Sequence, residues 1–313
     1  MKPILATRTL HAISELMLRD QGASYRRALR DLLPKVEDAY RGDEDPYRSH
    51  LGASIIGRDC AREVWYSWHW VTKPQFDGRM LRLFNRGHLE EARFVALLQI
   101  IDCEVWQFDE HGSQTRFTGH GGHYGGGLDA VIRGVPDMPS VPLLGEFKTH
   151  NDKSFQKLKA QGVRTAKFEH YVQMNQYMGG LNLSNALYLA ANKNDDELYG
   201  EIVPYDRENH ERFMDRARQI IEAKTAPAKI NESPGWFQCK FCDHREVCHG
   251  SKQPERNCRT CVHAIAGKKN GEWLCTNPNS FDFEHANMGL HVLTKEEQVH
   301  GCHAYEVNPA IKV

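Results

Sequence analysis

Two charged side chains lie two residues apart in the segment GEFKTH, residues 145–150, next to an apolar stretch. Residues two apart on a β-strand project from the same face, so Glu146 and Lys148 should lie side by side. Burying both charges costs free energy unless another group needs them there. Asp129 lies seventeen residues earlier in another predicted strand, and pairing of the two strands would bring it close.

Two converging carboxylates form an oxygen-rich site of the kind that Mg²⁺ or Mn²⁺ prefers. A lysine beside such an ion can orient or deprotonate a water molecule, while the ion stabilises charge on a phosphoryl oxygen. The alternative is a surface strand with an ordinary ion pair, because Glu-x-Lys is a common pattern. Asp137, in GVPDMP, is interpreted as a turn residue, since Asp129 has the better strand context.

The elements that must position these residues follow from the spacing of apolar residues. Helices are expected over 5–19, 24–41, 57–70, 79–101, 151–181 and 207–225, and strands over 103–109, 124–134, 142–149, 185–193 and 198–206. This order predicts an α/β fold with a mixed central sheet flanked by helices.

Composition limits the class of protein. The 313 residues are 40% hydrophobic and 26% charged, which is typical of a globular protein with a core. No apolar run approaches the roughly 20 residues of a membrane span, and the N-terminus lacks signal-peptide features, so a cytoplasmic protein without a membrane partner is expected. The net charge of −1 means that any nucleic-acid contact must rest on a local basic patch. The residues proposed for phosphate contacts are Lys153, Lys157, Lys159, Arg164 and Lys167.

Seven of the nine cysteines fall between residues 239 and 302, which indicates metal binding in a cytosolic chain. The first group, C-x2-C-x5-C, has three thiolates and is one short of a tetrahedral or cubane set. The second group, C-x2-C-x13-C-x26-C, suits a structural Zn²⁺ site in a small module. Its ligands would be Cys258, Cys261, Cys275 and Cys302, whereas Cys103 is interpreted as an ordinary buried cysteine.

Three motifs in order resemble the PD-(D/E)xK nuclease superfamily. GLDAV followed by GEFKT resembles its D…(D/E)xK signature, HYVQMNQYMGG resembles the Q-x-x-x-Y motif of the RecB-like branch, and NRGHLEEARF resembles the first motif of that branch. The resemblance covers roughly residues 55–250 and implies a restriction-endonuclease-like core. The implied organisation is an N-terminal helical segment over 1–50, a nuclease domain closed by a four-cysteine cluster over 51–250, and a Cys₄ zinc-binding module over 251–313.

The resemblance also implies roles for individual residues. Asp129, Glu146 and the Phe147 carbonyl would bind Mg²⁺ or Mn²⁺, and Lys148 would be the catalytic lysine. The remaining catalytic candidates are Gln173, which would contact DNA or orient the lysine and water, and Tyr177, which would support it.

The first motif leaves the last metal ligand open. His88 and Glu91 share a helix face, and either would be the ligand, while Glu90 points elsewhere. A histidine on the helix surface is the alternative interpretation of His88.

The segment GRDCAREVWY resembles the lone N-terminal cysteine segment of RecB-like nucleases with an iron–sulfur staple, such as AddB and the CRISPR-adaptation Cas nucleases. This implies a [4Fe–4S] cluster, with zinc as the alternative, held by Cys60, Cys239, Cys242 and Cys248.

The implied function is a metal-dependent DNA exonuclease acting on single strands or duplex ends. Its expected setting is recombination, repair or degradation of phage or bacterial DNA, with a recombination or replication protein as a candidate partner. The alternatives are a structure-selective single-strand endonuclease and a catalytically inactive DNA-binding or scaffold protein.

Overall fold

The computed structural model describes residues 2–36, 39, 47–280 and 290–312, and it divides the chain into two compact units. The first unit comprises residues 1–43, 76–117 and 127–210, and the second comprises residues 44–75, 118–126 and 211–313. The three segments expected from the sequence stay a prediction. Within the described ranges, no helix is both long and apolar enough to cross a membrane.

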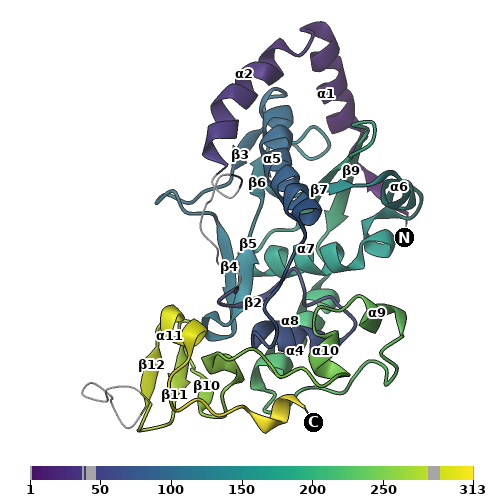
Figure 1. Cartoon of the computed structure of the whole chain (residues 1–313). Helices are drawn as coiled ribbons and strands as arrows, with labels where there is room; N and C mark the ends of the chain where they lie inside the picture. The colour runs from purple at the N-terminus through teal and green to yellow at the C-terminus, as the bar shows by residue number, and fades with distance from the viewer. Residues whose placement is uncertain (1, 37–38, 40–46, 281–289, 313) are drawn as a thin grey trace. The chain divides into compact units, whose positions relative to one another are not determined.

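The first unit is built on a six-stranded mixed sheet with the order β1-β9-β8-β7-β6-β3 (Figure 1). Only β7 and β8 pair in parallel, and the other neighbours are antiparallel. The strands are β1 (Ile4–Leu5), β3 (Glu104–Trp106), β6 (Ala130–Arg133), β7 (Leu143–His150), β8 (Asn185–Asn192) and β9 (Leu198–Pro204). The predicted α/β fold with a mixed central sheet is confirmed.

The helices of the first unit are α1 (Thr7–Arg19), α2 (Ala23–Leu32), the 3₁₀ turn η1 (Leu33–Lys35), α5 (Gly78–Gln99), α6 (Asp152–Ala166) and α7 (Phe168–Leu181). The helix predicted over 24–41 therefore ends earlier, and its residues 37–38 and 40–41 lie outside the described residues. The helix predicted over 151–181 is two helices, because the backbone leaves the helical conformation at Lys167. Asn151 begins α6 by accepting a hydrogen bond from the Ser154 N–H.

The two faces of β7 have different roles. Phe147 faces α5, where its ring stacks on Phe94 at 5.3 Å, within a core that includes Leu98, Ile132 and Leu143. Because side chains alternate along a strand, Glu146 and Lys148 project from the opposite face. That face is covered by α7, which crosses the sheet there (Figure 1).

The strand predicted over 124–134 is two strands in different sheets, and this corrects the expected setting of Asp129. Strand β5 (Tyr124–Gly127) belongs to a three-stranded sheet with the order β2-β5-β4, together with β2 (Leu51–Gly52) and the unpredicted β4 (Arg116–Gly119). Asp129 lies in the bend between β5 and β6. The run of glycines at 125–127 is poor in side-chain packing, which favours such a break in a strand.

The second unit contains α4 (Ala61–Trp68), most of α8 (Arg207–Glu222), short helices and turns, and a three-stranded sheet with the order β10-β11-β12. These short elements are η2 (His120–Gly122), α9 (Phe237–Lys240), α10 (Arg245–Cys248), η3 (Cys258–Thr260), β10 (Ala264–Ala266), β11 (Trp273–Cys275), β12 (His291–Leu293), α11 (Lys295–His300) and η6 (Pro309–Ile311). Helix α4 begins later than the predicted 57–70, because the Cys60 sulfur accepts the Glu63 N–H and caps it.

Candidate metal centre

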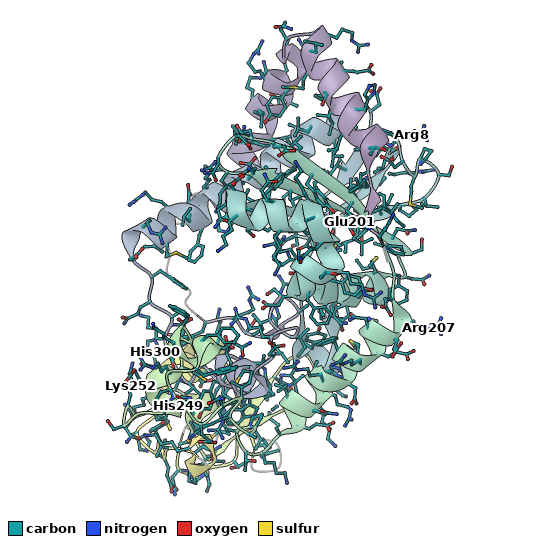
Figure 2. The ribbon with its side chains drawn as sticks, turned by 90° about the vertical axis from the view of Figure 1, so that its right-hand side faces the viewer. Arg8, Glu201, Arg207, His249, Lys252 and His300 are labelled. Atoms are coloured by element: carbon teal, nitrogen blue, oxygen red, sulfur yellow. The ribbon has the colours of Figure 1, made fainter. Side chains whose placement is uncertain are left out.

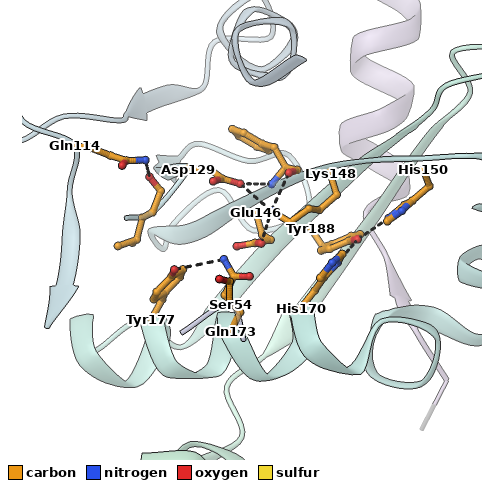
Figure 3. Close-up of polar contacts among 12 residues, drawn as sticks. Ser54, Gln114, Asp129, Glu146, Lys148, His150, His170, Gln173, Tyr177 and Tyr188 are labelled. Atoms are coloured by element: carbon orange, nitrogen blue, oxygen red, sulfur yellow. Dashed lines mark hydrogen bonds and ion pairs between the residues drawn. The ribbon is translucent and has the colours of Figure 1, made fainter. Parts of the chain in front are cut away.

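Three oxygen groups converge on the ammonium group of Lys148 (Figure 3). Its Nζ lies 2.6 Å from Glu146 Oε1, 3.5 Å from Asp129 Oδ2 and 3.1 Å from the Phe147 carbonyl oxygen. These are the three groups that the sequence motifs propose as metal ligands. A cation is therefore already stabilised at the point where they meet.

Backbone geometry fixes the position of Asp129 in this cluster. Its Oδ2 accepts a 2.7 Å hydrogen bond from the Phe147 N–H, so the carboxylate is attached to the middle of β7. Strands β6 and β7 pair antiparallel, with Ala130 opposite Gly145, which brings the preceding bend beside Glu146. The bend thus positions Asp129, although the sequence had indicated a strand.

Glu146 is fully buried, and neither of its carboxylate oxygens has a hydrogen-bond donor in suitable geometry within the described part of the chain. Its 2.6 Å contact with Lys148 is an ion pair. Burial raises the pKa of the Glu146 carboxyl to about 7; Lys148 opposes this rise and Asp129 adds to it. Burial would lower the pKa of Lys148, but the two carboxylates raise it above its usual range. The lysine therefore stays charged, and further positive charge beside Glu146 would lower the pKa of its carboxyl.

Helix α7 supplies the next layer of polar groups. Gln173 and Tyr177 lie one turn apart, and Gln173 Nε2 donates a 3.4 Å hydrogen bond to the Tyr177 hydroxyl. Burial raises the pKa of Tyr177, and the nearby Glu146 carboxylate raises it further. Gln173 and Tyr177 project from α7 toward the sheet face that carries Glu146, as Figure 3 shows.

Three polar residues on the same face were not identified from the sequence. The Tyr188 hydroxyl lies 2.9 Å from His150 Nε2 and 2.9 Å from His170 Nδ1 (Figure 3). Tyr188 stands opposite Glu146 in the parallel register of β7 and β8. The only sequence signal was His150, which continues the two-residue alternation of Glu146 and Lys148. The register that adds Tyr188 is not readable from one sequence.

The structure leaves the choice between His88 and Glu91 open. The ring Nδ1 of His88 is buried and has no hydrogen-bond partner among the described residues, so it is available as a ligand. Glu91 lines a cavity of about 550 Å³ beside α5. Glu90 is buried and forms a 3.0 Å ion pair with Arg93.

Two of the proposed DNA-binding cations pair with acidic residues. Lys159 forms a 2.5 Å ion pair with Glu197, and Arg164 lies 3.5 Å from Asp206. Both cations are exposed, so these pairs contribute little and can exchange for phosphate groups.

The other members of this basic group differ in burial. Lys153 and Lys157 are exposed and have no ion-pair partner within the described ranges. Lys167 is half-buried and donates a hydrogen bond to Ser154, and its pKa is lowered by burial and by the charge of Lys157. Lys153 and Lys157 are therefore the most available cations on α6.

Two other acidic residues in the first unit have structural roles. Asp137 accepts hydrogen bonds from the backbone N–H groups of Arg8 (Figure 2) and Thr9 and from the Thr9 hydroxyl, so it caps the start of α1. Glu201, also labelled in Figure 2, is buried and accepts hydrogen bonds from the Val163 N–H and the Tyr199 hydroxyl. Glu201 has donors, and in this respect it differs from Glu146.

The first cysteine set lines one small cavity in the second unit. Cys60, at the start of α4, lines it together with Cys239, Cys242 and Cys248. The cavity measures about 20 Å³, roughly the room for one water molecule, so it does not suit an organic ligand. Burial raises the pKa of Cys242 to about 12, and Cys60 is among the groups that add to this rise. The four cysteines therefore line the same cavity.

The second cysteine set lines a separate cavity of about 10 Å³ in the same unit. Burial raises the pKa of Cys258 to about 12, and Cys302, Cys261 and Cys275 all add to the rise. His263 lines the same cavity. Cys103 lies in the core of the first unit, as predicted.

The candidate ligands of the acidic site and of the two cysteine sets lie further apart than the ligands of a bound metal ion. Over the residues that the structure describes, no group of three or more histidine, cysteine, aspartate or glutamate side chains is close enough to hold a metal ion. In the acidic centre, the third oxygen is a backbone carbonyl and the Lys148 ammonium separates the carboxylates.

No family model matches the chain, and no curated protein matches it. Among solved structures, the chain is similar to that of SSO0001, with a TM-score of 0.40, 14% identity, and coverage of 74% of this chain and 100% of the other. It is also similar to two crystal structures of the alkaline exonuclease LHK-Exo from Laribacter hongkongensis, one of them in complex with dAMP. Each has a TM-score of 0.38, 11% identity, and coverage of 55% of this chain and 86% of the other. Similarities this low do not indicate a function, which must be inferred from the site.

Proposed function

We propose that the protein is a divalent-metal-dependent deoxyribonuclease of the PD-(D/E)xK type. One observation supports this most directly: the proposed ligands Asp129, Glu146 and the Phe147 carbonyl all contact a single cation, the Lys148 ammonium. The sequence motifs propose the same residues for Mg²⁺ or Mn²⁺. The buried carboxylate of Glu146, whose only close charged contact among the described residues besides Asp129 is Lys148, fits such an ion, because hard divalent cations prefer carboxylate and carbonyl oxygen.

Different residues would bind the metal ion, orient the attacking water molecule and position the lysine. Asp129, Glu146 and the Phe147 carbonyl would hold the ion, with His88 or Glu91 as a further ligand. When bound, the ion supplies positive charge that stabilises the developing charge on a phosphate oxygen and acidifies a water molecule. Lys148 orients that water for in-line attack on phosphorus. Gln173 holds the water or lysine in place, and its amide is itself held by Tyr177.

The substrate would be DNA bound by its phosphates. The exposed Lys153 and Lys157 on α6 follow directly after β7, so their charges lie on the element next to the site. Phosphate contacts of this kind hold a strand without reading its sequence. We therefore propose exonuclease action on DNA ends or single strands, with a structure-selective endonuclease as the competing form of the same activity.

The two cysteine sets would be structural metal centres. Cys60, Cys239, Cys242 and Cys248 supply four thiolates for a [4Fe–4S] cluster or a zinc ion, and Cys258, Cys261, Cys275 and Cys302 supply four for zinc. The shared cavities support this assignment, because each set of four thiols lines one small space. Such centres would stabilise the second unit, which has short helices and strands.

The decisive experiment is digestion of end-labelled DNA with and without Mn²⁺. Linear and circular single strands and blunt duplexes are compared, with the Lys148→Ala variant alongside the natural protein. Mn²⁺-dependent cleavage that disappears in Lys148→Ala supports the proposal, and loss of linear substrate alone indicates an exonuclease. Binding without cleavage by the natural protein would favour an inactive DNA-binding protein instead.

A further inference from the structure

The position of Lys148 raises a question about the metal-bound protein. Its ammonium occupies the point where Asp129, Glu146 and the Phe147 carbonyl meet. A divalent ion bound to the same oxygens would repel the ammonium strongly at a distance of a few ångströms. On the proposed function, this repulsion favours movement of the lysine when a divalent ion binds, and the displaced ammonium needs another acceptor on the same buried face.

Tyr188 is placed beside the path of that movement. Its backbone lies opposite Glu146, while its hydroxyl reaches His150, four residues further along β7. The Tyr188 side chain therefore runs past Lys148. The residue opposite Lys148 in the register is Ala190, whose small side chain does not extend between Lys148 and Tyr188 as a longer one would. Figure 3 shows the Tyr188 ring next to the Lys148 side chain.

The hydrogen bonds of Tyr188 leave one acceptor position unused. His150 and His170 lie on either side of its hydroxyl, each at 2.9 Å. Burial lowers the pKa of His150 to about 3 and that of His170 to about 2, with nearby lysines adding to both shifts, so both rings are neutral. The hydroxyl can donate its proton to one ring and accept an N–H from the other. Its second lone pair has no partner among the described contacts.

We propose that Tyr188 is a positioning residue, whose oxygen, held between His150 and His170, receives the Lys148 ammonium when a divalent ion occupies the carboxylate site. The ammonium then remains within reach of the attacking water. The two histidines prevent the tyrosine from turning away. Lys148 thus has two positions, one on the carboxylates and one on Tyr188, and the metal ion selects between them.

The test is a double-mutant cycle on metal affinity, measured without DNA. Mn²⁺ binding is followed by electron paramagnetic resonance for the natural protein, Tyr188→Phe, Lys148→Met and the double variant. Tyr188→Phe should weaken Mn²⁺ binding by on the order of tenfold, because the lysine keeps competing for the carboxylates. Lys148→Met should tighten binding by removing the competitor. In that background Tyr188→Phe should change nothing.

Kinetics and a matched control separate this role from a structural one. With saturating Mn²⁺, Tyr188→Phe should lower kcat by on the order of tenfold while KM for DNA stays constant. Tyr199→Phe removes the hydroxyl of another buried tyrosine, one that donates to Glu201, and should leave both Mn²⁺ affinity and kcat unchanged. If Tyr188→Phe does not fold, His170→Phe should weaken binding less, and only when Lys148 is present.

The experiments distinguish failure of the proposed Tyr188 role from failure of the proposed nuclease function. Equal weakening of Mn²⁺ binding by Tyr188→Phe with and without Lys148, or no weakening at all, would overturn the role of Tyr188 while DNA cleavage by the natural protein keeps the proposed function. Mn²⁺ binding that shows the expected coupling, in a protein that cleaves no DNA, would support the two lysine positions and refute the nuclease. Absence of Mn²⁺ binding by the natural protein would overturn both.

Discussion

The buried carboxylate of Glu146 and the ammonium of Lys148 form a 2.6 Å ion pair on one face of a single strand. Burying such a pair costs more desolvation energy than a surface pair, and stability alone seldom justifies it. This desolvation cost is expected where the two charges take part in a reaction. The same face contains Asp129 within 3.5 Å of the lysine, and the consequences can be tested residue by residue.

Asp129→Asn should abolish Mn²⁺-dependent DNA cleavage. The asparagine oxygen can still accept the Phe147 N–H, so the bend is retained, but the ligand loses its charge. The loss of several kcal/mol of charge stabilisation corresponds to a rate decrease of about 10³ or more. The measurement is the rate of release of labelled nucleotides at saturating Mn²⁺.

Asp137→Asn is the matched control for Asp129, because Asp137 follows a proline and mimics the family motif. Asp137 caps α1 through Arg8 and Thr9, and asparagine keeps only one of the two acceptor oxygens, so the variant should lower stability by no more than about 1 kcal/mol without affecting cleavage. Cleavage lost in Asp137→Asn and kept in Asp129→Asn would mean that the wrong aspartate has been assigned to the site.

Cys60→Ser should remove the metal of the first cysteine set and leave α4 intact. Serine is a good helix cap, so it can replace the Cys60 sulfur as acceptor for the Glu63 N–H while being a poor metal ligand. Iron and zinc per chain and the visible absorption spectrum are measured after anaerobic purification. The natural protein should contain both metal centres, and Cys60→Ser should lose only the first.

Two further cysteine variants are compared with Cys60→Ser for their metal content. Cys258→Ser should lose the zinc of the second set and keep the first centre. Cys103→Ser alters a thiol in the core of the first unit and should keep both metals. Full metal content in Cys60→Ser would show that the fourth ligand is another residue.

Arg259→Lys should destabilise the second unit by about 3 kcal/mol. The guanidinium lies 3.7 Å from the centre of the Trp70 ring and donates hydrogen bonds to the carbonyls of Trp68 and Ser49 and to Gln298. A lysine ammonium cannot donate these three hydrogen bonds in the planar arrangement of the guanidinium. Each buried acceptor left without a donor costs about 1–3 kcal/mol. Urea unfolding followed by tryptophan fluorescence measures the change.

The exposed Arg218 provides the control for this variant. It pairs with Asp215 and Glu222 on the surface of α8, so Arg218→Lys should change stability by no more than about 0.5 kcal/mol. Similar stability of the two variants would mean that the stacked position of Arg259 has no special energetic role.

Stability of the second unit should fall as the pH decreases below 6.5. Burial lowers the pKa of His69 to about 3, with the charge of Arg259 contributing, and its ring stacks on Trp65 at 3.7 Å. Above pH 6.5 the ring is neutral in both the folded and the unfolded protein. Between pH 6.5 and about 3 the unfolded chain binds a proton that the folded chain does not, so folding becomes less favourable by about 1.4 kcal/mol per pH unit.

The measurement is the free energy of unfolding in urea at pH 7.5, 6 and 5 for the natural protein and for His69→Phe. His244 and His123 also have lowered pKa values, so the variant should reduce the pH dependence without removing it. An unchanged slope in His69→Phe would contradict the buried neutral state of this ring.

The parts of the site that depend on local spacing were predictable. Glu146 and Lys148 share a face because strand residues alternate, and Gln173 and Tyr177 meet because they are one helical turn apart. The expected mixed sheet followed from the order of helices and strands.

The parts that depend on strand register and chain reversal were not predictable. Tyr188 reaches His150 only through the parallel register of β7 and β8, which local sequence does not specify. Asp129 was assigned to a strand, but the chain changes sheets at that point, because β5 and β6 pair with different partners. A single sequence records neither which strands pair nor where a strand leaves its sheet.

The parallel pairing of β7 with β8 also affects how the protein is made. Parallel neighbours need a long crossover, here α6 and α7, so Tyr188 and its strand leave the ribosome well after residues 129–148. A chain still in synthesis would already expose its carboxylates and lysine but would lack the strand and helix that enclose them. On the proposed function, nuclease activity would begin late in translation, and unfinished chains would leave the DNA of the cell intact.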